Sequence, residues 1–185
     1  IFVVDTPFLI AKLEEEAAKE EPRKLRYVLR DLAVAENAFA YEYTGYLSNI
    51  HSVKAYFDAN LDMLESHKFY KLFAPNQKVY TKVKNEEPTY YSDSSEVKLS
   101  QFASGSIVRG KVENSVISRN VDLSEGSSVS HSILFPRVKV AKGATVEYAI
   151  VDKGVEIAEG VTIRGTENNP VVIKKGSVVT EDIVR

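Results

Sequence analysis

Histidines, a row of arginines and a pair of aspartates are the side chains in this sequence whose types could support chemistry. His51 and His67 lie well apart in the sequence, and a metal site would need further ligands beside them. No other residue stands at the spacing of metal ligands, so we predict no metal site. Asp58 and Asp62 lie about one helical turn apart, and a solvated acidic face is the simpler interpretation of that pair.

The arginine row lies on a predicted helix over residues 23–32. Arg23, Arg26 and Arg30 point to one side of this helix, and guanidinium groups in such a row can bind a phosphate. A solvated helix face is the commoner meaning of the pattern. We therefore favour the face over the phosphate site.

The composition excludes several classes of protein. The 185 residues carry a net charge of −2, and no run of like charge is long enough to indicate nucleic acid or a membrane surface as partner. Cysteine is absent, which excludes a disulfide framework and a thiol nucleophile. No apolar run approaches membrane-spanning length, and no signal peptide is visible. We expect a cytoplasmic protein and, because the sequence begins with Ile1, a piece of a longer one.

Residues 1–73 are predicted to form the end of an α/β layer. A buried strand over 1–4 precedes helices over 7–19 and 23–32, a strand over 38–43 alternates aromatic with small residues, and a helix covers 53–66. No glycine loop that would bind phosphates occurs here. The segment is therefore predicted to be half of a domain.

Two of these helices have recognisable starts, and the chain then passes into a connection. Asp5 or Thr6 can cap the first helix, Pro7 suits its first turn, and Ser52 can cap the last. Residues 74–99 contain few aliphatic side chains and are predicted to join two domains. Within them, the alternation over Val79–Lys84 predicts a single strand.

A 17-residue repeat organises the rest of the chain. The aliphatic columns are Val112/Val129/Val146/Ile163, Ile117/Leu134/Val151 and Leu123/Val140/Ile157. The small or β-branched columns, two residues earlier, are Ser115/Ser132/Ala149, Val121/Val138/Val155 and Ser127/Ala144/Val161. Gly126, Gly143 and Gly160 recur where a corner would need φ > 0.

This pattern predicts a three-sided parallel β-coil from about Ser100 onward. A helix has an apolar period of 3.6, and a hairpin meander would need regular turn pairs that are absent. After Ile163 a loop over 165–170 interrupts the step, and a partial coil resumes with Ile173 and Val179. The repeat resembles the hexapeptide-repeat family, and that resemblance implies a left-handed parallel β-helix. The general crossover rule alone would favour the opposite hand.

The order of the parts resembles one enzyme family more closely. Gly45-Tyr46-Leu47-Ser48-Asn49-Ile50-His51-Ser52, the helix around Tyr56–Leu64, the passage Val79–Val83 with Pro88-Thr89, and the β-helix together resemble the C-terminal part of ADP-glucose pyrophosphorylase, also called glucose-1-phosphate adenylyltransferase. The resemblance implies a nucleotidyltransferase-like α/β part over 1–73, a connection over 74–99 and a left-handed β-helix over 100–185. It covers essentially the whole chain.

The loop departs from the family pattern at two positions. Catalytic members read Gly-Tyr-Trp-x-Asp-Val-Gly-Thr here, and the resemblance implies that the Asp helps to hold the Mg²⁺ that bridges the phosphates of ATP. Asn49 is a neutral amide in its place, and His51 replaces a glycine. The resemblance thus implies a degenerate sugar-nucleotide and Mg²⁺ pocket at Tyr46, Asn49 and His51, with no catalytic residue and no metal or other cofactor in this segment.

The same departure resembles the GlgD-type subunit, which implies a regulatory partner of a catalytic subunit in glycogen biosynthesis, within a homo- or hetero-oligomer, by the resemblance a tetramer. An ordinary catalytic enzyme that tolerates Asn49 is the alternative. A third class is acyl transfer with His131 as base, because many hexapeptide-repeat proteins are acyltransferases. We rank acyl transfer below both, since His131 shares its column with Asn114 and Tyr148 and reads as polar exterior. A pure assembly module remains compatible with regulation.

Overall fold

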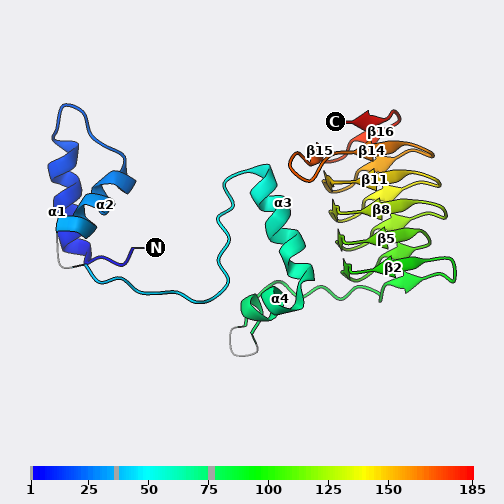
Figure 1. Cartoon of the computed structure of the whole chain (residues 1–185), viewed down its shortest axis with the longest axis horizontal. Helices are drawn as coiled ribbons and strands as arrows, with labels where there is room; N and C mark the ends of the chain where they lie inside the picture. The colour runs from blue at the N-terminus through cyan, green and yellow to red at the C-terminus, as the bar shows by residue number, and fades with distance from the viewer. Residues whose placement is uncertain (1, 36–37, 75–77) are drawn as a thin grey trace. The chain divides into compact units, whose positions relative to one another are not determined.

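The computed structural model describes residues 2–35, 38–74 and 78–185. The chain divides into two compact units, Ile1–Thr44 and Gly45–Arg185, and each is described by itself (Figure 1). Within the described residues, no helix is both long and apolar enough to cross a membrane. The extents of the three predicted domains stay a prediction.

The first unit consists of two helices, α1 (Thr6–Ala17) and α2 (Leu25–Ala35). The carboxylate of Asp5 caps α1 by accepting a hydrogen bond from the amide of Phe8 at 3.1 Å, and Pro7 lies in the first turn. Both predicted helices are therefore confirmed, although their ends are shifted.

Arg23, just before α2, and Arg26 and Arg30, on α2, contact side chains of the same unit. Arg23 bonds the buried carboxylate of Glu16 through Nε at 2.8 Å and Asp31 through Nη1 at 2.6 Å. Arg30 bonds Asp31 as well, and Arg26 lies over the ring of the tyrosine that follows it. Hydrogen bonds from Arg23 hold the pKa of Glu16 well below its usual range. The interpretation of the row as a phosphate site gains no support.

Three predicted strands are wrong. Residues 2–4, 38–43 and 79–84 belong to no helix and to no strand of the described structure, and Ile1 lies outside it. Their apolar side chains are largely exposed, among them Val3 at 98% and Phe39 at 96%. Alternation shows which side of a strand is apolar, but a strand forms only where a second backbone accepts and donates hydrogen bonds.

The second unit begins with the helices that follow the loop 45–52. α3 (Val53–Leu61) is capped by the hydroxyl of Ser52, which accepts from the amide of Ala55 at 3.1 Å. The predicted helix over 53–66 is too long. It gives way to the 3₁₀ turn η1 (Asp62–Leu64), and α4 (Ser66–Leu72), which was not predicted, follows an extended Glu65.

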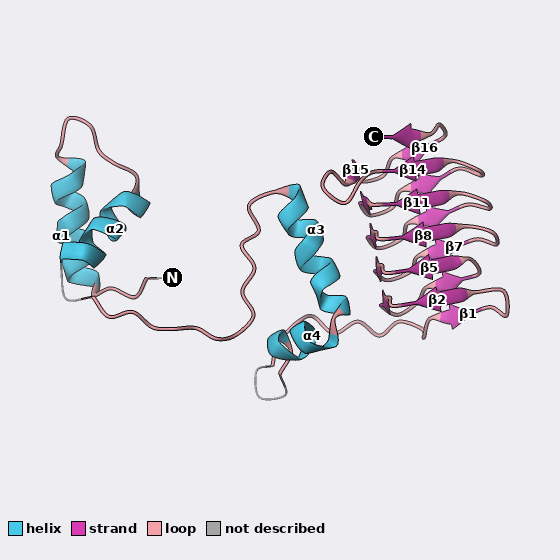
Figure 2. Cartoon of the chain, viewed as in Figure 1, coloured by secondary structure: helices cyan, strands magenta, loops and turns pink. Residues whose placement is uncertain are grey.

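The rest of this unit is a parallel β-solenoid of three sheets (Figure 2). Sheet A contains β1 (Tyr90–Tyr91), β4 (Ile107–Val108), β7 (Asp122–Leu123), β10 (Lys139–Val140), β13 (Glu156–Ile157) and β16 (Val178–Val179). Sheet B contains β2 (Glu96–Lys98), β5 (Lys111–Glu113), β8 (Ser128–Ser130), β11 (Thr145–Glu147), β14 (Thr162–Arg164) and β17 (Ile183–Val184). Sheet C contains β3 (Gln101–Phe102), β6 (Val116–Ile117), β9 (Ile133–Leu134), β12 (Ala149–Val151) and β15 (Val171–Ile173).

The register of the solenoid follows the repeat. Val129 pairs with Val112 and Val146, so the repeat step is one full coil, and the predicted columns are buried inside the prism. The mostly β solenoid is thereby confirmed, while its left hand stays a prediction. The first coil begins at Tyr90, whereas the prediction placed its start at Ser100. The earlier start was missed because the step from Val97 to Val112 is shorter than the later steps and does not fit their pattern.

Small polar residues at the corners have definite partners. Ser132 is fully buried, and its hydroxyl donates to the carbonyl of Ser130 at 2.7 Å and accepts from the amide of Ala149 in the next coil at 3.1 Å. Ser115 does the same one coil earlier. The serines of the small columns therefore form hydrogen bonds with backbone groups, besides fitting the limited space at the corners. Gly143 has φ +69°, as the glycine column predicted.

Sheet C differs from the other two sheets because its outer face is apolar. Ile133 and Ile150 point away from the prism and are nevertheless buried, since Phe57 of α3 packs on them and is itself only 1% exposed. The side-chain amide of Gln101 also donates to the carbonyl of Met63 in η1. The helices α3 to α4 are thus attached to one side of the solenoid.

Candidate functional site

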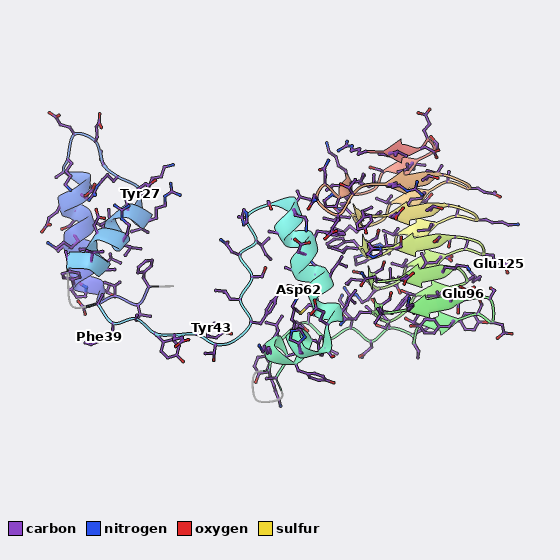
Figure 3. All side chains as sticks on the ribbon, in the orientation of Figure 1. Tyr27, Phe39, Tyr43, Asp62, Glu96 and Glu125 are labelled. Carbon is purple, nitrogen blue, oxygen red and sulfur yellow. The ribbon has the colours of Figure 1, made fainter. Side chains whose placement is uncertain are left out.

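A groove of about 890 Å³ lies between these helices and the solenoid. One wall comes from α3, η1 and the start of α4, and the other from a corner of successive coils, with Glu167 of the loop 165–170 at its border. Ligand sites are commonly concave and of this size. Figure 3 shows Asp62 at the helical side of this region.

The solenoid wall is a column of four corner residues, Leu99, Asn114, His131 and Tyr148, with φ of 43°, 48°, 45° and 47°. The amide of His131 donates to the carbonyl of Glu113, one coil back, at 3.1 Å. The imidazole stacks on the ring of Tyr148, with centroids 4.7 Å apart. Left-handed corners made by residues other than glycine were not predicted.

The side chain of His131 is less exposed than we predicted from the repeat position that it shares with Asn114 and Tyr148. Its side chain is half-buried, and the Nδ1 atom is covered and has no hydrogen-bond partner within the described residues. A general base must reach the proton that it removes. The structure offers nothing that favours the acyl-transfer alternative.

The helical wall is acidic and is ordered by two lysines. Lys54 binds both carboxylate oxygens of Asp58, at 2.5 and 2.6 Å. Lys68 binds Asp62 at 2.6 Å and Glu65 at 2.7 Å. These two carboxylates raise the pKa of the Lys68 ammonium, so it remains charged. The sequence had suggested only a solvated acidic face here, whereas the structure places Asp58 and Asp62 in a groove.

Of the three predicted pocket residues, Asn49 and His51 contact each other, whereas Tyr46 bonds to the acidic wall. The hydroxyl of Tyr46 donates to Asp62 at 3.0 Å, which attaches the loop to the acidic wall. Asn49 is exposed, and its carbonyl accepts from the amide of His51 at 3.1 Å. His51 is exposed beside a separate apolar hollow that Ile150 and Val172 also line. Their role as a nucleotide pocket stays a prediction.

The loop 45–52 does not fit a Mg²⁺ site. Mg²⁺ prefers carboxylate oxygens, and Asn49 presents a neutral amide on the surface. In the part of the chain that the structure describes, no group of three or more His, Cys, Asp or Glu side chains could hold a metal ion. The loop itself contains no Asp or Glu, so it supplies no carboxylate ligand to a metal.

The pKa of Tyr46 tests the attachment of the loop. Burial of the phenol, followed by the hydrogen bond to Asp62, raises this pKa above the ordinary value of 10.0. The folded state therefore gains stability from Tyr46 below pH 10.0 and loses it as the pH rises through the folded pKa. Asp62→Asn should lower the pKa of Tyr46 without returning it to 10.0, because burial remains.

Tyrosine ¹³C-ζ shifts measured against pH would report this value, with Tyr46→Phe to assign the signal. Tyr70→Phe removes a phenol that is 66% exposed on α4, and as the matched control it should leave the titration of Tyr46 unchanged. An unchanged titration of Tyr46 in Asp62→Asn would contradict the contact.

Most residues that line the groove were not predicted from the sequence. The repeat does place Asn114, His131 and Tyr148 in one column, and this was the available signal for the solenoid wall. Nothing in the sequence indicated that α3 packs on sheet C. The opposing wall, with Lys54 and Glu65, therefore could not be found.

Comparison with known proteins identifies similar chains. The family described as GlmU-like, C-terminal hexapeptide matches residues 85–184. The glycogen biosynthesis protein GlgD of Bacillus subtilis (strain 168) is 40% identical over 141 residues, which are 76% of this chain and 41% of that protein. GlgD of Geobacillus stearothermophilus is 53% identical over 127 residues, 69% of this chain and 37% of that protein.

A glucose-1-phosphate adenylyltransferase, from Mycoplasma mobile, is 31% identical over 105 residues, 57% of this chain and 27% of the enzyme. The resemblance to ADP-glucose pyrophosphorylase, and within it to the GlgD type, is confirmed. The chain spans about two fifths of the length of the two GlgD relatives.

Proposed function

This chain belongs to the GlmU-like, C-terminal hexapeptide family, and from that premise we propose that it is the C-terminal part of a regulatory, non-catalytic subunit in glycogen biosynthesis. Its parent protein modulates a catalytic glucose-1-phosphate adenylyltransferase, which makes ADP-glucose from ATP and glucose 1-phosphate. The similarity to two GlgD proteins supports the pathway. The parent protein acts in the cytoplasm.

One observation carries the non-catalytic role. Asn49 stands where a carboxylate would have to neutralise charge on a metal–nucleotide complex, and its side chain is an exposed amide. Phosphoryl transfer depends almost wholly on positioning and charge stabilisation, so the loss of a charged metal ligand removes most of the rate. His51 adds a side chain where a bound ligand would approach the backbone.

The solenoid supports the assembly side of the proposal. It is a continuous prism with a core of stacked aliphatic columns, and such rigid repeats present extended surfaces to partners. The parent protein forms a hetero-oligomer with the catalytic subunit, and a tetramer is the expected size. Regulation then follows if the subunit favours one arrangement of that assembly.

The test is ADP-glucose synthesis by the full-length parent protein, alone and mixed with a catalytic subunit. Alone it should be at least about 100-fold slower than the catalytic subunit, because charge stabilisation at the phosphates is missing. In the mixture it should change the rate or the substrate affinity of the partner. Asn49→Asp should raise the activity of the protein alone if the upstream metal ligands are intact.

The matched control is Asn168→Asp, which makes the same chemical change in the exposed solenoid loop and should leave every rate unchanged. Robust Mg²⁺-dependent synthesis by the unmodified protein alone would overturn the proposal. The protein would then be an ordinary catalytic adenylyltransferase that tolerates Asn49.

A further inference from the structure

Two adjacent residues of the 3₁₀ turn η1 bond to different parts of the second unit. The carboxylate of Asp62 (Figure 3) accepts from the hydroxyl of Tyr46 at 3.0 Å and so holds the loop that carries this tyrosine. The carbonyl of Met63 accepts from the side-chain amide of Gln101 at 2.5 Å, which attaches the turn to the first coil of the solenoid. Because neighbouring Cα atoms are about 3.8 Å apart, neither residue can move far without the other. The loop and the first coil are thus joined through a single turn of backbone.

Gln101 is fixed on the solenoid side of this connection. It lies in β3, where its backbone amide donates to the carbonyl of Ser115 at 3.0 Å and the strand pairs in parallel with β6. Carbonyl groups near the end of a helix lack an intrahelical partner, and Gln101 supplies one to Met63 just after α3. A strand of the solenoid therefore caps this helical segment with a side chain.

Asp62 is fixed on the helical side by Lys68. The ammonium of Lys68 donates to Oδ1 of Asp62 at 2.6 Å and to Glu65 at 2.7 Å, while the hydroxyl of Tyr46 donates to Oδ2 of Asp62. Since both carboxylate oxygens of Asp62 are engaged, a displacement of η1 either breaks one of these bonds or takes Tyr46 along. Short 3₁₀ segments between helices have poorer hydrogen bonds than α-helices and often mark a hinge.

We propose that η1 is a hinge that couples the loop carrying Tyr46 to the first coil of the solenoid, with Gln101 as the positioning residue. While Gln101 holds the carbonyl of Met63, the carboxylate of Asp62 lies where the phenol reaches it. When that bond is lost, the loop loses its anchor. A partner that moves the first coil therefore moves the loop, and a ligand on the loop acts on the coil with the same coupling energy.

This inference deepens the proposed function, because it names the route by which the solenoid regulates the loop. It rests on the proposed function for the role of the loop in regulation. The coupling itself depends only on the contacts of Asp62 and Met63.

Replacement of Gln101 by methionine tests the coupling in the full-length parent protein. Gln101→Met keeps the length of the side chain and removes the donor, so the pKa of Tyr46, followed by its ¹³C-ζ signal, should fall toward the ordinary value of 10.0. Lys139→Met places the same side chain on sheet A, where Lys139 is 65% exposed, and should leave the titration unchanged. An unchanged titration in Gln101→Met, or an equal change in Lys139→Met, would overturn the proposal.

A double variant tests the route through Asp62. Asp62→Ala removes both acceptor oxygens, so the addition of Gln101→Met should change the Tyr46 signal no further. A second change as large as that of Gln101→Met alone would overturn the route through this carboxylate.

The reciprocal measurement starts from the loop. Tyr46→Phe removes only the hydroxyl, and the side-chain amide protons of Gln101 should then exchange with solvent at least about 5-fold faster, the lower end of the usual range for coupled sites. Gln101→Met assigns their signals. Tyr70→Phe removes a phenol that is 66% exposed on α4 and should leave the exchange unchanged. Equal exchange in Tyr46→Phe and in the unmodified protein would overturn the coupling, even if Gln101→Met folds poorly.

Neither of these measurements uses ADP-glucose synthesis, so failure of the coupling and failure of the proposed function are distinguished. In the mixture with a catalytic subunit, Gln101→Met should lower the effect on the partner's rate at least about 5-fold relative to Lys139→Met. An undiminished effect on the partner would overturn η1 as the route of regulation.

Discussion

Gly110→Ala should lower the free energy of unfolding of the solenoid by about 3 kcal/mol or more. A Cβ at this position would lie 2.3 Å from Oγ of Ser127 and 2.4 Å from its carbonyl oxygen. Ser127 is buried, and its carbonyl accepts from the amide of Lys111 at 2.8 Å. The next coil would have to move away, and this bond between coils would be strained or lost.

Gly160→Ala is the matched control because it adds the same methyl group in open space. Apart from its own chain neighbours, no atom lies within 4 Å of the position that a Cβ would take, and the only strain is its φ of +71°, which should cost about 1 kcal/mol. Urea unfolding followed by circular dichroism would compare the two variants. Equal midpoints would show that the close approach at Gly110 relaxes without loss of coil pairing.

Phe57→Ala should detach the helices from sheet C at a cost of about 3–5 kcal/mol. Phe57 is the buried contact between α3 and the outer face of Ile133 and Ile150. The prism has its own continuous core of stacked aliphatic columns, so we expect it to remain folded. Native-state hydrogen exchange should show the amides of α3 losing protection while those of β9 and β12 keep theirs.

Tyr70→Ala removes an aromatic ring of similar size that is 66% exposed on α4, and it should change stability by less than about 0.5 kcal/mol. Loss of protection in β9 and β12 together with α3 would contradict the expected independence of the solenoid. The Phe57 result also bears on the loop 45–52. Tyr46 is bonded to Asp62, so undocking of the helices should release that loop from the solenoid.

The sequence by itself determined the solenoid. Each coil packs on the coils directly before and after it. The kind of residue that a given position needs therefore recurs at a fixed step along the sequence and is visible as a column. The aliphatic column through Val129, the small-residue column through Ser132 and the positive φ of Gly143 were all predicted from that step. The caps at Asp5 and Ser52 could also be predicted from the sequence, because a cap is a contact between residues that are close neighbours in the chain.

Only the tertiary structure decided the groove and the state of the predicted strands. The strands predicted over 38–43 and 79–84 have suitable side chains, but no backbone pairs with them in the described structure. The groove depends on the packing of Phe57 against Ile133, which are far apart in sequence, and Phe57 lies outside the repeat. Contacts of this kind leave no local period, because burial of an apolar face can be satisfied by many partners and the sequence does not state which one is used.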